Sequence, residues 1–78
     1  MLQLMQVTLT PPRAAHVARR LDQDLKWTND RIYVMREIEA ADELGFTDPD
    51  NPNYRPVQLV LKPSIARLVW RLAKEVPA

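Results

Sequence analysis

The chain has 78 residues, of which 46% are hydrophobic and 27% charged, with a formal net charge of +1, one Gly, seven Pro and no Cys. With no Cys and a single His, it lacks the residues for a disulfide framework or for the usual zinc ligand sets. The hydrophobic fraction is too high for a disordered chain, and no apolar run reaches the roughly 18 residues of a membrane span. We therefore expect one small cytoplasmic (intracellular) domain that needs no cofactor and no membrane.

The net charge of +1 hides an uneven distribution. Residues 1–20 carry +3, residues 21–50 carry −6 and residues 51–78 carry +4. Charges this segregated favour contacts between the basic ends and the acidic middle, between copies of the chain, or with an anionic ligand.

Residues 1–25 are predicted to form a strand followed by a helix. Apolar and polar side chains alternate over Met5–Leu9, which is typical of a half-buried strand. Pro11-Pro12 ends the strand, because proline cannot donate to a ladder, and suits a helix start. The helix is expected over Pro12–Leu25. One helical face carries its apolar residues: Ala14, Val17, Ala18, Leu21 and Leu25.

A central helix is predicted within residues 28–45. Either the chain turns between Lys26 and Asn29, which we favour, or one long helix continues from the first and faces two partners. Thr28 or Asn29 can cap its start, and Gly45 suits the left-handed position that ends a helix. Its expected apolar residues are Val34, Met35, Ile38 and Ala41. Residues 46–56 are rich in Pro, Asp and Asn, which indicates a loop.

Residues 57–77 are predicted to form a second unit of a strand and a helix. Val57, Leu59 and Leu61 alternate with more polar neighbours, and the helix is expected over Ser64–Val76. The fold class is therefore a small single α+β domain with the order β-α-α-β-α. The two strands need a partner, each other or a second copy, and a two-stranded sheet is marginal alone. A homodimer or larger homo-oligomer is therefore expected.

Two helical faces carry the candidate binding residues. Arg13, His16 and Arg20 are spaced to form a basic stripe on the solvent side of the first helix. On the third helix, Arg67, Arg71 and Lys74 repeat this pattern. Both stripes could bind an acidic protein, a nucleotide or a nucleic acid, or could simply be solvated.

Trp70 lies on the flank of the third helix, and Tyr54 lies in the loop. Both are candidate contact residues, because aromatic side chains are enriched at interface hot spots.

The sequence contains no nucleophile–base set and no metal-ligand cluster, so we expect no catalytic residue, no metal site and no enzyme. The favoured hypothesis is a non-catalytic interaction protein: an adaptor, an inhibitor like those of bacterial viruses, or a ligand-sequestering module. It would act as a homo-oligomer on an anionic protein or ligand.

Residues 5–46 resemble the pattern of ribbon-helix-helix DNA-binding proteins, with a strand of alternating polar residues followed by two helices. The resemblance implies a dimeric transcriptional regulator whose paired strands enter the major groove, with Gln6, Thr8 and Thr10 facing outward. The chain departs from the family because its strand has no Arg or Lys, its second helix is acidic, and residues 47–78 have no counterpart. DNA binding is therefore the alternative hypothesis.

Overall fold

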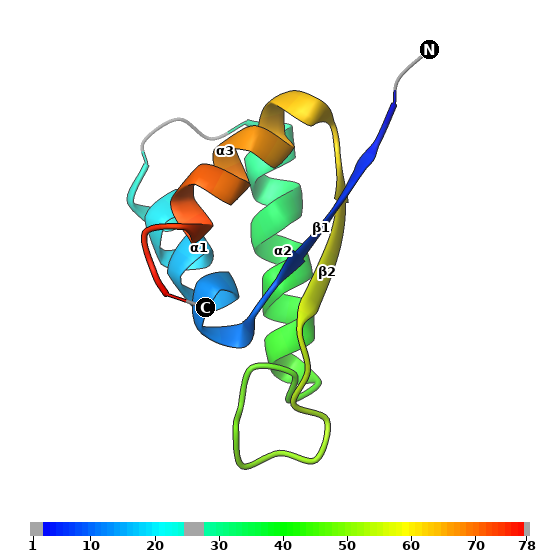
Figure 1. Cartoon of the computed structure of the whole chain (residues 1–78), viewed down its shortest axis with the longest axis vertical. Helices are drawn as coiled ribbons and strands as arrows, with labels where there is room; N and C mark the ends of the chain where they lie inside the picture. The colour runs from blue at the N-terminus through cyan, green and yellow to red at the C-terminus, as the bar shows by residue number, and fades with distance from the viewer. Residues whose placement is uncertain (1–2, 25–27, 78) are drawn as a thin grey trace.

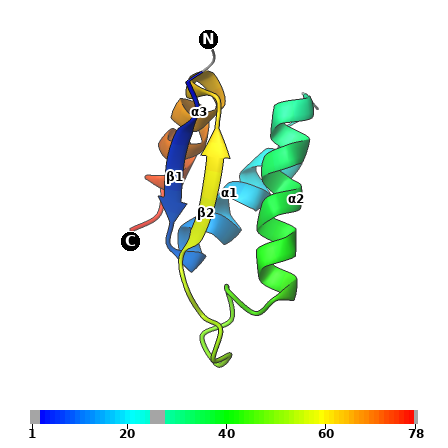
Figure 2. The same ribbon diagram turned by 90° about the vertical axis from the view of Figure 1, so that its right-hand side faces the viewer.

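The structure, a computed structural model that describes residues 3–24 and 28–77, is an α+β domain with the order β-α-α-β-α. Its elements are β1 (Met5–Leu9), α1 (Pro11–Gln23), α2 (Asn29–Glu43), β2 (Val57–Leu61) and α3 (Pro63–Ala73). The helices lie behind and beside a two-stranded sheet, with α3 behind β1 and α2 beside β2 (Figure 1 and Figure 2). The predicted fold class is confirmed.

The two strands pair with each other. They run antiparallel, and Val7 lies opposite Leu59 at the centre of the register. One edge of β1 is thus occupied within the chain, whereas a ribbon-helix-helix strand pairs with its counterpart in a second copy. Assembly with another copy stays a prediction, because the structure contains one chain.

A single hydrophobic core lies between the sheet and the helices. The predicted alternation holds except at Met5, which is 46% exposed, and the two strands bury Val7, Leu9, Val57, Leu59 and Leu61. Each helix adds the apolar face that its spacing predicts. These buried helical residues include Ala14, Val17, Leu21, Val34, Ile38, Ala41, Ile65, Val69 and Leu72.

Both strand-to-helix junctions have the same geometry. Thr10 and Lys62 precede the helices with nearly equal dihedral angles (φ −62°, ψ 153° and φ −62°, ψ 149°), and a proline follows each. Proline fixes its own φ near the helical value and lacks an N–H that the first turn would leave unpaired. Thr10 does not face outward as the ribbon-helix-helix pattern requires: its Oγ1 is buried, with no hydrogen-bond partner among the described residues.

Two helices end earlier than predicted. Asp24 has extended backbone (φ −82°, ψ 130°), so α1 ends at Gln23 and not at Leu25. Leu25 and Lys26, and with them most of the expected turn, lie outside the described residues. At the other end of the chain, α3 stops at Ala73 instead of Val76. Val76 precedes Pro77, and proline disfavours helical backbone in the residue before it.

The predicted caps of α2 are present. The Thr28 Oγ1 accepts a hydrogen bond from the Arg31 N–H at 3.3 Å. At the other end Gly45 adopts φ 84°, and the N–H of Phe46 donates to the Ala41 carbonyl at 3.0 Å. This left-handed ending turns Phe46 back toward the core.

Candidate functional site

The basic stripe of α1 contacts the segment that follows α3. His16 Nε2 and Arg20 Nε donate to the same carboxylate oxygen of Glu75, at 2.8 Å and 2.9 Å. Arg13 Nε donates to the Val76 carbonyl at 2.9 Å. The stripe was expected on the solvent side, but its own chain occupies it, and the His16 side chain is only 21% exposed. The reason is the early end of α3, which brings an acidic residue back over α1.

These contacts lower the pKa of the Glu75 carboxyl. The hydrogen bond from His16 has the largest effect and that from Arg20 the next, because both stabilise the charged form. The carboxylate is exposed to solvent, which screens the two ion pairs. The contact therefore positions the C-terminal segment more than it stabilises the fold.

We expect this contact to weaken in acid. The pKa of Glu75 is lower in the folded chain than in the unfolded chain, where it is about 4.3. The stability that the ionised carboxylate contributes to folding is therefore fully present above the unfolded pKa. It is lost as the pH falls through the folded pKa. In a carboxyl NMR titration, Glu75 should titrate at lower pH in the wild type than in the His16→Ala/Arg20→Gln variant. Arg19→Gln, an exposed neighbour on α1, is the control. Equal midpoints in all three proteins would contradict the expectation.

One cation from each stripe lies beside an exposed indole. Trp70 is 39% exposed, and the Arg13 guanidinium carbon and the Lys74 Nζ each lie 5.7 Å from its ring centroid. Cations at this distance are attracted to the face of the ring. The hydrogen bond from Arg13 to the C-terminal segment holds one of these two cations in place.

A shallow hollow of about 240 Å³ lies between β1 and α3 beside this indole. Met5, Arg67 and Trp70 contribute to its lining, and the Met5 side chain is 46% exposed. We call the group of Met5, Arg13, Arg67, Trp70 and Lys74 the Trp70 surface. It joins residues of β1, α1 and α3 with Lys74, which directly follows α3, and combines apolar area with positive charge.

Arg20 and Arg71, one from each predicted stripe, line a second hollow of about 260 Å³ with Arg31. Arg20 is paired with Glu75 and Arg31 with Asp24. Arg71 forms no ion pair within residues 3–24 and 28–77. The two stripes therefore meet at this hollow, but two of its three arginines are already paired with carboxylates.

Tyr54 is not part of this region. It is 43% exposed on the loop between α2 and β2, which projects at the bottom of the molecule away from α3 (Figure 1). Among the site residues, sequence reasoning missed Met5 and Glu75. A signal for Glu75 was present, because it is the single acid in residues 51–78, a segment that is otherwise basic.

Over the described ranges, no three His, Asp or Glu side chains are grouped so that they could hold a metal ion. None of the helices described has the length and apolar character that crossing a bilayer requires. No family model, no curated protein and no solved structure matches the chain.

Proposed function

We propose that the chain is a non-catalytic binding protein, an adaptor or inhibitor, that docks on an acidic protein surface through the Trp70 surface. The observation that carries the proposal is the exposed indole of Trp70 with Arg13 and Lys74 beside its ring. Trp and Arg are the residues most enriched among interface hot spots.

The geometry supports a protein partner with an apolar anchor and flanking carboxylates. The hollow between Met5 and Trp70 offers apolar area for one side chain. Arg67 and Lys74, both exposed, can then pair with acidic side chains around that anchor. Arg13 is held by the C-terminal segment before any partner arrives, which lowers the ordering cost of binding.

The charge distribution favours protein over nucleic acid. The net charge is only +1, because exposed carboxylates of α2, which repel a polyanion, offset the basic faces: Glu37, Glu39, Asp42 and Glu43. A local acidic patch on a protein avoids this repulsion. Duplex DNA binding, the alternative from the sequence, is therefore an outcome that the test must be able to detect.

The test compares two matched double variants. Arg67→Glu/Trp70→Ala alters the Trp70 surface, and Arg36→Glu/Tyr33→Ala removes an exposed aromatic and an arginine with the same spacing on α2. Each protein is used to capture partners from the host lysate, and the affinity of the purified partner is measured by calorimetry. The Trp70 variant should lose about 30-fold or more in affinity, and the α2 variant should bind like the wild type.

Circular dichroism confirms that both variants are folded before binding is compared. Equal affinity of the Trp70 variant and the wild type would reject the proposal. So would a captured partner without an acidic surface, or a duplex oligonucleotide that binds the wild type and competes with the protein.

A further inference from the structure

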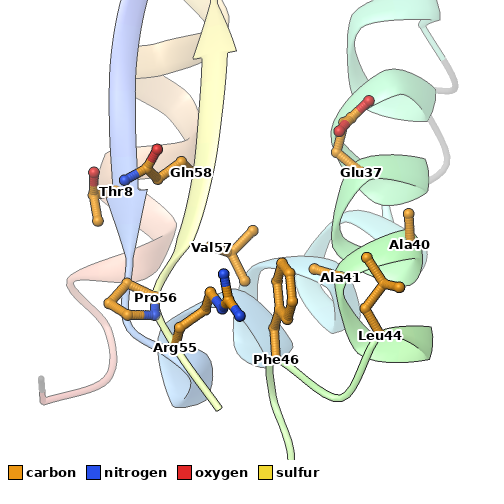
Figure 3. A pocket seen from close by; sticks show the side chains of 10 residues that line it. All are labelled: Thr8, Glu37, Ala40, Ala41, Leu44, Phe46, Arg55, Pro56, Val57 and Gln58. Carbon is orange, nitrogen blue, oxygen red and sulfur yellow. The ribbon is translucent and has the colours of Figure 1, made fainter. Parts of the chain in front are cut away.

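A groove of about 520 Å³ lies between the C-terminal half of α2, the start of β2 and the loop that joins them. Figure 3 shows side chains from all three segments around it. Its volume is within the range of small-ligand sites, about 300–1,000 Å³. Sequence reasoning gave neither Arg55 nor Gln58, two of its polar lining residues, a functional role.

The floor of the groove is apolar. Ala41 and Val57 belong to the buried core, Phe46 packs against that core, and Leu44 remains 57% exposed. The helix ends at Gly45, between Leu44 and Phe46, and both of these side chains line the groove. An apolar side chain of a ligand would therefore find area for burial here.

Arg55 is the cation of the groove, and its guanidinium is held in place. It lies over the Phe46 ring, 4.4 Å from the centroid, and its Nε donates to the Asn53 carbonyl at 3.1 Å. The Arg55 backbone N–H also donates to the Phe46 carbonyl at 3.1 Å. Within the described part of the chain Arg55 forms no ion pair, so its terminal N–H groups remain as a fork for a carboxylate.

The remaining polar groups differ in character. Gln58 accepts a hydrogen bond from Gln6 through its Oε1, at 3.3 Å, which leaves its NH₂ group as a donor. Glu37, on the α2 side in Figure 3, supplies an acceptor with negative charge. A multiply charged anion such as a phosphate would be repelled by Glu37. A ligand with one carboxylate and an N–H donor matches both charged groups, with the carboxylate toward Arg55 and the N–H toward Glu37.

We propose that this groove binds the C-terminal end of a peptide whose last residue is apolar. The terminal carboxylate pairs with Arg55, the apolar side chain lies against Phe46 and Leu44, and the N–H groups of the peptide face Glu37. This site is separate from the proposed docking through Trp70, so either proposal can fail alone.

The test titrates the full chain with four small probes and follows backbone amide NMR signals. Ala-Leu has every feature, Ala-Leu amide lacks the carboxylate, N-acetyl-Ala-Leu lacks the ammonium group, and 4-methylpentanoate lacks the peptide. Ala-Leu should shift the signals of Phe46, Val57 and Gln58. The amide probe should bind about tenfold more weakly or worse, since it loses the charge-assisted pair, and 4-methylpentanoate should also bind more weakly than Ala-Leu.

Two variants test the roles proposed for Arg55, which pairs with the carboxylate, and for Glu37, which faces the peptide N–H groups. Arg55→Gln should lose the preference for the carboxylate, and Glu37→Gln should weaken both Ala-Leu and N-acetyl-Ala-Leu, because both keep the peptide N–H groups assigned to Glu37. Arg36→Gln and Glu39→Gln, on α2 but outside the groove lining, are the matched controls. The proposal is overturned if the groove signals do not shift, if the amide binds equally well, or if Arg55→Gln changes nothing. Equal binding of 4-methylpentanoate and Ala-Leu would overturn the peptide assignment.

Discussion

Replacing Leu59 by Ala should lower the free energy of unfolding by about 2–5 kcal/mol, the usual range for a leucine buried in a well-packed core. Leu59 is 1% exposed at the centre of β2, opposite Val7. A domain of this size has a total stability of about 4–12 kcal/mol, so the loss removes a large share of it. Truncation leaves a cavity between the sheet and the helices. The pairing of β2 with β1 holds the strand in place, so the cavity cannot close.

The measurement for Leu59→Ala is urea unfolding followed by circular dichroism. Val60→Ala is the matched control, because Val60 is the next residue on the same strand, 49% exposed on the opposite face. Its effect should be below about 1 kcal/mol. A Leu59→Ala variant that lost no more stability than Val60→Ala would contradict the described packing of β2.

Replacing Gly45 by Ala should destabilise the chain by about 1–3 kcal/mol, for two separate reasons. The backbone at Gly45 has φ 84°, which side-chain-bearing residues rarely adopt. An added Cβ would also overlap Nδ2 and Cγ of Asn51. Asn51 cannot move freely, because its Oδ1 accepts a hydrogen bond from the Asn53 N–H at 2.9 Å.

A double-mutant cycle separates these two causes. Asn51→Ala removes the clash but not the backbone strain, so it should recover part of the loss in the Gly45→Ala background. Urea midpoints of the four proteins give the coupling. If Gly45→Ala is as stable as the wild type, α2 does not end in the left-handed turn. The substitution should also disturb the peptide groove, because Gly45 precedes Phe46.

The local part of the fold was predictable because its signals are local. Strand alternation, proline at the helix starts, Thr28 as a cap and Gly45 as a helix end depend on neighbouring residues and backbone sterics. The errors came at α1 and α3, which end before the predicted residues. There the apolar spacing continues for another turn while the backbone does not.

The candidate sites show the limit of the same reasoning. Arg67 and Trp70 were identified from their helix face, and they do lie beside one hollow. Arg55 gave no comparable signal, because a single arginine in a polar loop has no periodic context. Its importance depends on Phe46 being folded against it, which requires the whole loop.

The sequence by itself determined the elements, their order, the buried faces and the segregation of charge, since these follow from periodicity and composition. Only the tertiary structure decided which charged side chains pair within the chain and which do not. His16 and Glu75 are 59 residues apart in the chain, and their contact depends on how α1 and α3 pack and where α3 ends. Hydrophobic burial determines that packing, and the ion pairs follow from it. The basic residues therefore divide into those that pair within the chain and those that form no ion pair among the described residues.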